Sequence, residues 1–306
     1  MNRKSRKVIA FILKLITNKS SFFFWLFVRF ISAILPLITI YQFSGIIKLI
    51  EQHQSFNQIA LAVLLLFIVR VIDNTLRLKS ITKLEYEITS ISFDIHNLFL
   101  AGIHCETKEE RHSAVQAIRN FADASSTTLN LIKQPGVDSF VAVLFIPIIL
   151  LFVDFQIFTV TIAYILIYYF IDYYTTQRYA NLKDILNGKT EAYYAKLQDS
   201  GDFDLEQKTW SRHFNRVTSW GFSEWSLLQN TAVFFYSVIL LYLVSLTVSG
   251  SKQLSDVILI MGYVSQIQVL LNSFSSIQDN LSDMNVGLQR LAKNTSISAI
   301  NLNDLT

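Results

Sequence analysis

The sequence predicts an all-α, polytopic membrane protein with six transmembrane helices and long cytoplasmic helical extensions. Of its 306 residues, 52% are hydrophobic and only 16% are charged, whereas soluble domains have about 25% charged residues. Several uncharged runs are long enough to cross a hydrocarbon core of about 30 Å at about 1.5 Å per residue. Three prolines and nine glycines leave room for long unbroken helices.

The chain begins with a basic segment, residues 1–20, that contains no acidic residue. Lysine and arginine favour the cytoplasmic side, so we expect this segment there. The apolar run from about Ser21 to Ile47 is longer than the core of a signal peptide, and we expect a retained first helix. Arg29 should lie near its cytoplasmic end and extend towards the headgroups, and Pro36 should kink it.

A predicted loop, Lys48–Ser55, leads to the second apolar run, Ile59–Val69. Arg70, Asp73 and Arg77 follow at helical spacing, on one face. An arginine at this depth needs a partner, and Asp73 can pair with both arginines. The triad is interpreted either as a structural ion pair at the membrane boundary or as part of a substrate site.

The second helix is expected to continue over Asn74–Leu100, which would project about 40 Å beyond the membrane. Apolar residues at helical spacing support this continuation. They are Ile81, Leu84, Ile88, Ile91, Ile95 and Leu98. A short break at Gly102–His112 separates it from a returning helix. That helix should bend or enter the bilayer at Pro135 and Gly136.

Two uncharged runs, Ser139–Val153 and Phe155–Ile171, are separated only by Asp154. One continuous helix would be about 50 Å long and exceed the core thickness, so a tight hairpin with Asp154 at its outer turn is predicted. A second polar excursion, Asp172–Glu224, follows. Acidic residues at the spans should therefore be limited to Asp73, at a boundary, and Asp154, at a turn.

The fifth span is the uncharged run Trp225–Ser251, and Gly250 to Lys252 should turn the chain outside the membrane. The sixth helix begins at Leu254, contains an uncharged run of 22 residues, Val257–Gln278, and is expected to continue to Arg290. This divides the chain into a basic segment (1–20), a six-helix domain (21–290) and a short cytoplasmic tail (291–306).

The distribution of basic residues sets the predicted orientation. The outer connections contain only Lys48 and Lys252 as basic residues, so both termini should be cytoplasmic. The expected location is a bacterial inner (plasma) membrane, with membrane lipid as a partner and no nucleic acid.

A polar stripe follows one face of the sixth helix. Its members are Ser265, Gln268, Asn272, Ser275 and Asp279. Polar groups that face lipid lack hydrogen-bond partners, so the stripe should face protein or a water-filled cavity. Pathway lining and a helix-packing face held by serine and asparagine remain equal alternatives.

Topology and local sequence together resemble the transmembrane domain of ABC exporters, over nearly the whole chain. Val153–Phe155 is similar to the outer turn between the third and fourth helices of that family. The approach to the sixth helix through Gly250, Leu254 and Ser255 is also similar. Arg290 stands where the family has a basic residue at the end of this helix.

The resemblance implies two short coupling helices, at about 102–111 and 195–206, that dock on a nucleotide-binding subunit. The candidate coupling residues are Glu106, Lys108 and Glu109 in the first and Asp202, Phe203 and Leu205 in the second. The second turn departs from the family, because acidic residues replace its usual Val-Lys-Ala-Phe-like stretch. These residues are Asp199, Asp202, Asp204 and Glu206.

The chain has no ATPase motif of its own. Gly188, Lys189 and Thr190 resemble the end of a phosphate-binding loop, but the motif needs glycine at position 183, which is Lys183. The single cysteine, Cys105, and the histidine spacing give no zinc pattern. We therefore expect a non-catalytic chain that binds no cofactor, with ATP on a partner subunit.

The favoured hypothesis is an exporter subunit that dimerises, with itself or with another half-transporter, and is driven by a separate ATPase. The candidate pathway residues are Arg70, Asp73, Arg77, Ser265, Gln268 and Asn272. Dimerisation is also expected because Ile81, Leu84 and Ile88 would otherwise lack cover. The alternative is a motorless scaffold or regulator. A membrane enzyme is a third hypothesis, without a visible catalytic constellation.

Overall fold

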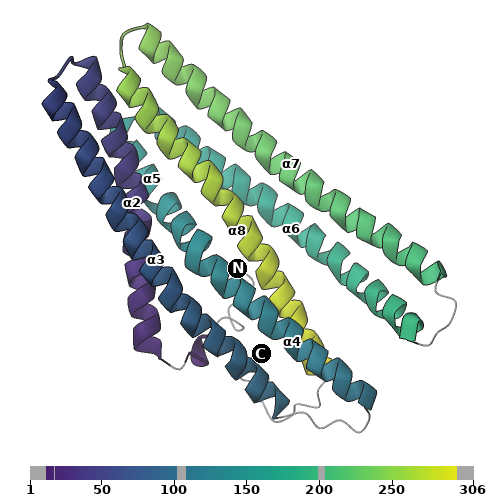
Figure 1. Ribbon diagram of the computed structural model, residues 1–306. Helices are drawn as coiled ribbons and strands as arrows, with labels where there is room; N and C mark the ends of the chain where they lie inside the picture. The colour runs from purple at the N-terminus through teal and green to yellow at the C-terminus, as the bar shows by residue number, and fades with distance from the viewer. Residues whose placement is uncertain (1–11, 17, 102–107, 199–203, 295–306) are drawn as a thin grey trace. The chain divides into compact units, whose positions relative to one another are not determined.

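The computed structural model describes residues 12–16, 18–101, 108–198 and 204–294, and the elements that it defines there are all helices (Figure 1). They are α2 (Lys19–Glu51), α3 (Phe56–Leu100), α4 (Lys108–Leu131), the π-helical turn η1 (Ile132–Gly136), α5 (Val137–Val153), α6 (Phe155–Gln198), α7 (Asp204–Val248) and α8 (Leu254–Asn294).

In the described part of the chain, six helical stretches are long and apolar enough to cross a membrane. They are Lys19–Glu51, Phe56–Leu100, Ala117–Val153, Phe155–Thr190, Asp204–Val248 and Leu254–Ser273. The chain is therefore an all-α, multi-pass membrane protein, as its composition predicts.

Several helix ends differ from the sequence prediction. α2 extends to Glu51 and passes through Pro36, which leaves a shorter connection to α3 than expected. α4 begins at Lys108, inside the predicted break, and α8 continues to Asn294, past the expected end at Arg290. The continuation of α3 to Leu100 is confirmed.

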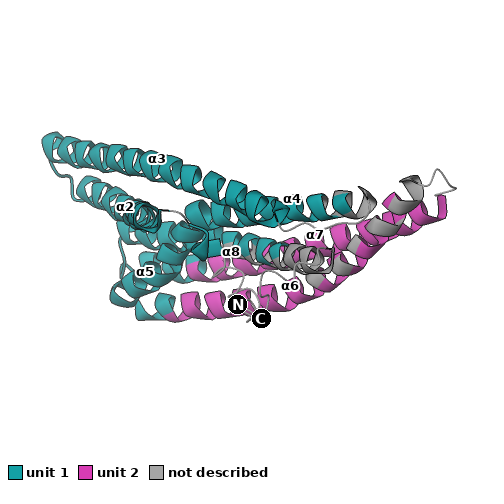
Figure 2. Cartoon of the chain, turned by 90° about the horizontal axis from the view of Figure 1, so that it is seen from below, with its two compact units in different colours: residues 1–158, 240–306 teal, residues 159–239 magenta. Residues whose placement is uncertain are grey.

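The chain divides into two compact units, coloured separately in Figure 2. Residues 1–158 and 240–306 form the first unit, and residues 159–239 form the second. The first contains α2 to α5 and α8. The second contains most of α6 and α7.

The core of the first unit lies where α3 packs against α4, and Leu84 and Ile88 are fully buried in it. The expectation that these residues lack cover is therefore wrong. Phe99 is buried against Phe121, with ring centroids 5.9 Å apart. The predicted Leu98 is 41% exposed, because Phe99 continues the buried face. The remaining core residues are Ile12, Ile16, Phe22, Ile91, Ile95, Ile118, Ala122, Leu129, Leu281 and Met284.

α2 and α8 approach each other closely at Gly262. A β-carbon at this position would lie 2.8 Å from the Cγ2 atom of Ile40, so only glycine fits without a shift. The Tyr263 hydroxyl donates to the Leu37 carbonyl at 3.2 Å. Interhelical hydrogen bonds and small residues are typical of membrane helix packing.

Asp154 forms the predicted tight turn between α5 and α6. Its Oδ1 accepts hydrogen bonds from the backbone N–H groups of Gln156, at 3.0 Å, and Ile157, at 3.2 Å. It also forms an ion pair with Lys252 at 3.2 Å. One carboxylate thus caps α6 and connects two turns of the chain.

The turn between α7 and α8 is also confirmed. Gly250 has a φ of 74°, a conformation that glycine adopts without steric cost. The Glu51 carboxylate accepts hydrogen bonds from the N–H groups of Leu254, at 3.0 Å, and Ser255, at 3.3 Å. A carboxylate here also interacts favourably with the helix dipole.

In the second unit, large side chains of α6 and α7 contact each other at several positions. Tyr164 contacts Phe235, with ring centroids 5.3 Å apart. Further along, Trp210 stacks on Tyr193 and donates a hydrogen bond to Thr190 Oγ1 at 3.0 Å. The pair therefore stays together well beyond its apolar segments.

Candidate functional site

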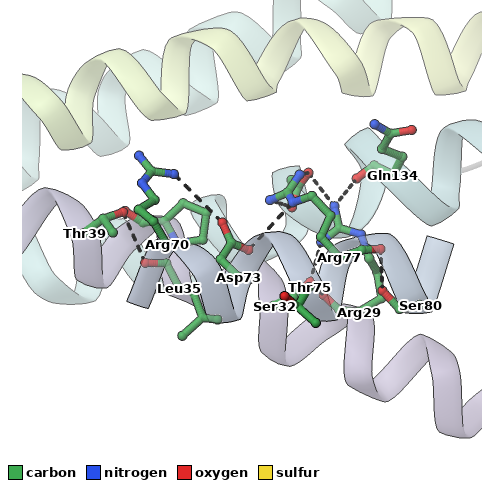
Figure 3. A network of polar contacts seen from close by, with 12 residues as sticks. Arg29, Ser32, Leu35, Thr39, Arg70, Asp73, Thr75, Arg77, Ser80 and Gln134 are labelled. Atoms are coloured by element: carbon green, nitrogen blue, oxygen red, sulfur yellow. Dashed lines mark hydrogen bonds and ion pairs between the residues drawn. The ribbon is translucent and has the colours of Figure 1, made fainter. Parts of the chain in front are cut away.

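A buried cluster of charged residues joins α2, α3 and α5 (Figure 3). Arg29 of α2 has no exposed surface. Its guanidinium donates to Asp138 Oδ2 at 2.6 Å, to the Gln134 carbonyl at 3.1 Å and to Ser32 Oγ at 3.0 Å. The expectation that Arg29 extends towards lipid headgroups is therefore wrong. Its two terminal nitrogens thus donate to protein groups, whereas Nε has no hydrogen-bond partner among the described residues.

Asp138, in the first turn of α5, lies between two guanidinium groups. Besides Arg29, it contacts Arg77 of α3 through two hydrogen bonds, of 3.1 and 3.4 Å. Paired contacts between guanidinium and carboxylate groups are strong and directional. Asp138 thus connects α2 and α3 to α5. The sequence analysis missed it because it directly precedes an uncharged run.

Asp73 pairs with both predicted arginines on α3. Its carboxylate lies 3.7 Å from Arg77 Nε and 3.9 Å from Arg70, so the contacts are ionic rather than close hydrogen bonds. Figure 3 shows the three side chains along one side of α3. The predicted pairing is confirmed. Asp73 is buried, whereas the Arg70 side chain is 54% exposed.

The cluster has an excess of positive charge. Three guanidinium groups (Arg29, Arg70, Arg77) face two carboxylates (Asp73, Asp138), which leaves one positive charge. Arg70 is the most exposed of the three cations. The arrangement can therefore attract an anion at Arg70 while the inner pairs hold the helices.

The π-helical turn η1 supplies a backbone acceptor to this cluster. Pro135 lies inside η1 and has no N–H group to donate, which disturbs the regular hydrogen bonding of the helix. The Gln134 carbonyl accepts from Arg29. A second buried cation, Lys133, pairs with Glu85 of α3. The predicted irregularity at Pro135 and Gly136 is therefore a local widening within a continuing helix.

The polar stripe on α8 lies on its less buried side. Ser265 is exposed, and Gln268 and Asn272 are half-buried. The side chains of Ser275 and Asp279 lie outside the described residues. The hydroxyl oxygen of Ser139, the residue after Asp138, is 2.7 Å from the Leu270 carbonyl oxygen of α8. Ser139 therefore connects the segment that carries Asp138 to the helix that carries the stripe.

The expected coupling residues fall mostly at or outside the edges of the described chain. Glu106, Asp202 and Phe203 are outside the described residues. Lys108 and Glu109 begin α4, and Leu205 lies in the first turn of α7, 73% exposed. The described parts of both predicted coupling helices, 108–111 and 195–198 with 204–206, are thus ends of long helices rather than separate elements.

The second unit contains two buried acidic residues, Asp172 and Glu224, that the sequence analysis placed in a polar excursion. The Glu224 carboxylate accepts hydrogen bonds from the hydroxyls of Thr175, at 2.6 Å, and Thr176, at 3.5 Å. The expectation that acidic residues at the spans are limited to Asp73 and Asp154 is therefore wrong. The helical spacing of Asp172, Thr175 and Thr176 could have indicated a buried polar face.

Comparison with known proteins assigns no relative: no protein-family model matches the chain, and no curated protein matches it. The fold and the charge cluster define an integral, multi-pass helical membrane protein.

Proposed function

We propose that this chain is the membrane-spanning subunit of an ABC-type exporter. In this proposal it forms the substrate pathway and is driven by an ATPase carried on a separate chain. The observation that carries the proposal is the length of the paired helices. α3 has 45 residues, which correspond to about 68 Å, more than twice a hydrocarbon core of about 30 Å. α6 and α7 have 44 and 45 residues.

The connectivity supports this reading of the long helices. α3 and α4 contact each other and lead to the segment 102–107, and α6 and α7 lead to 199–203. The helix ends that flank these two segments are the ends opposite the short turns at Asp154 and Gly250 or at the loop after Glu51. Because basic residues are scarce in the short turns, the opposite ends of the long helices belong in the cytoplasm. An ATPase that docks there would move α3 and α4, or α6 and α7, as levers.

In this proposal the charge cluster holds one state of the transport cycle. Asp138 joins α2 and α3 to α5, so a helix movement that opens the pathway would break its contacts with Arg29 or Arg77. Arg70 and the stripe on α8 would line the pathway. The working unit would be a dimer, with a second copy or with another half-transporter.

The test is affinity purification of the tagged chain from its native membrane in mild detergent, followed by mass spectrometry. The variant Leu205→Asp places a charge at the exposed start of α7. The matched control is Val248→Asp, which places the same charge at the exposed opposite end of the same helix. Expression and helix content of both variants should equal those of the unmodified chain.

The proposal predicts that an ATPase copurifies in near-equal amount, and that Leu205→Asp, but not Val248→Asp, removes it. Purification of the chain without any ATPase, at native expression, contradicts it. That result favours a motorless scaffold or regulator.

A further inference from the structure

A small cavity between α6 and α7 is lined by two arginines, Arg178 and Arg216. Its volume is about 220 Å³, and its lining is Arg178, Leu182, Arg216, Ser219, Trp220 and Ser223. All six residues belong to the second unit. Among the described residues, no carboxylate lies within ion-pair distance of Arg178 or Arg216.

The guanidinium of Arg178 is held in place by an aromatic ring. It lies 4.3 Å from the centre of the Trp220 ring, a distance typical of cation–π contacts. The Trp220 Nε1–H group donates to the Thr175 carbonyl at 3.3 Å, which fixes the indole against α6. Arg216 precedes Trp220 by one helical turn on α7. The N–H groups of Arg178 thus remain available for a ligand.

The chemistry of the lining favours a phosphate ester. Guanidinium groups bind phosphate oxygens in pairs of parallel hydrogen bonds, and the exposed hydroxyl of Ser219 supplies a further donor. The Ser223 hydroxyl already donates to the Ser219 carbonyl at 2.8 Å. The nearby Glu224 already accepts hydrogen bonds from Thr175 and Thr176 and is buried. A cavity of this volume accommodates a phosphate group with part of its ester.

The position along the helices favours a lipid as the source of that phosphate. The apolar run of α7 begins at Trp225; Ser223 lies two residues, about 3 Å, before it, and Arg216 lies nine residues, about 14 Å, before it. Arg178 lies seven residues, about 10 Å, beyond Ile171, the end of the apolar run of α6. The headgroup layer is about 5–8 Å thick on each side, and arginine side chains bridge the remaining distance.

We propose that this cavity binds the phosphate ester of an anionic phospholipid, through Arg178 and Arg216, at the end of the apolar segments of α6 and α7. The proposal depends on this helix pair alone and not on transport. Basic pockets between membrane helices bind anionic headgroups by the same physical principle.

The test uses the full chain in nanodiscs made from equal amounts of phosphatidylglycerol and phosphatidylcholine. Native mass spectrometry then releases the protein from the nanodisc and measures the ratio of the two lipids that stay bound to it. The double variant Arg178→Gln/Arg216→Gln removes both charges of the cavity. The matched control, Lys208→Gln/Arg212→Gln, removes two exposed charges of α7 that do not line it.

The unmodified chain and the control should retain phosphatidylglycerol preferentially. In the glutamine double variant, the ratio of bound phosphatidylglycerol to bound phosphatidylcholine should fall about tenfold. Arg178→Lys/Arg216→Lys should keep part of the preference, because charge remains while the paired hydrogen bonds are lost, and it serves if the glutamine variant misfolds. Displacement of the lipid by millimolar inorganic phosphate supports a phosphate site that also accepts a soluble source. An equal lipid ratio in the glutamine variant and its control overturns the proposal.

Discussion

Replacing Asp138 by asparagine tests the buried charge cluster most sharply, because this carboxylate contacts two guanidinium groups. The substitution keeps the size of the side chain and removes its charge. Arg29, which lies 2.6 Å from the carboxylate and is fully buried, then retains only neutral acceptors. Removing one partner of a buried ion pair costs about 3–5 kcal/mol. We expect a loss of stability in this range.

The opposite substitution should cost less. Arg29→Met removes the guanidinium but keeps a long side chain, and Asp138 retains Arg77 at 3.1 Å. We expect a loss of about 1–3 kcal/mol, comparable to a lost charged hydrogen bond. The double variant Arg29→Met/Asp138→Asn should be more stable than Asp138→Asn alone, because Arg29 no longer leaves a buried cation without a counter-charge. A gain in stability on adding Arg29→Met to Asp138→Asn is the result expected specifically for a buried ion pair.

The assay is thermal unfolding in detergent, followed by circular dichroism at one scan rate, because membrane proteins often unfold irreversibly. At roughly 2–4 °C per kcal/mol for large domains, Asp138→Asn should lower the midpoint by about 6 °C or more. The control is Asp123→Asn, which breaks an exposed pair with Arg119 at 3.8 Å and should cost less than about 1 kcal/mol. Equal midpoints for Asp138→Asn and Asp123→Asn would refute the reasoning.

Two further predictions concern helix packing and the outer turns. Gly262→Ala should destabilise the chain by about 1–3 kcal/mol, because its β-carbon would lie 2.8 Å from Ile40. Gly45→Ala, with nothing within 4 Å of the added atom, should be neutral or stabilising by up to about 1 kcal/mol. Equal changes in the thermal midpoint for Gly262→Ala and Gly45→Ala would contradict this prediction. Asp154→Ala should cost about 1 kcal/mol more than Asp154→Asn, because asparagine keeps the cap of α6 and loses only the pair with Lys252. Similar midpoints for these two variants would show that the cap contributes little.

The helices themselves were predictable, because their signals are local. Uncharged runs gave all six spans, the single charge at Asp154 gave the hairpin, and apolar spacing along α3 gave its continuation to Leu100. The ion pairs of Asp73 were predictable for the same reason, since residues three and four apart on a helix are neighbours.

The partners of Arg29 were not predictable from local sequence. Asp138 is 109 residues away, and only packing brings the two together. An arginine near a helix end is equally compatible with a headgroup contact and with a buried pair. The same limit applies to Leu84 and Ile88, whose apolar face finds its cover within the chain rather than in a second copy.

The burial of Asp172 and Glu224 does not follow from the sequence pattern, because a charged residue next to an apolar run ordinarily indicates the end of a span. In the structure, threonine hydroxyls of α6 satisfy Glu224, so a carboxylate fits inside the helix pair. The threonines that donate to Glu224 lie on α6, one turn after Asp172. Hydroxyl residues at this spacing indicate that a neighbouring carboxylate can be buried with hydrogen-bond partners.

The central claim is that a separately encoded ATPase drives this membrane chain, and the mass of the complex tests it most directly. The tagged chain would be purified from its own membrane at native expression and its native mass determined. The account predicts two membrane chains together with ATPase subunits in equal number. A mass that matches only multiples of this chain would contradict it.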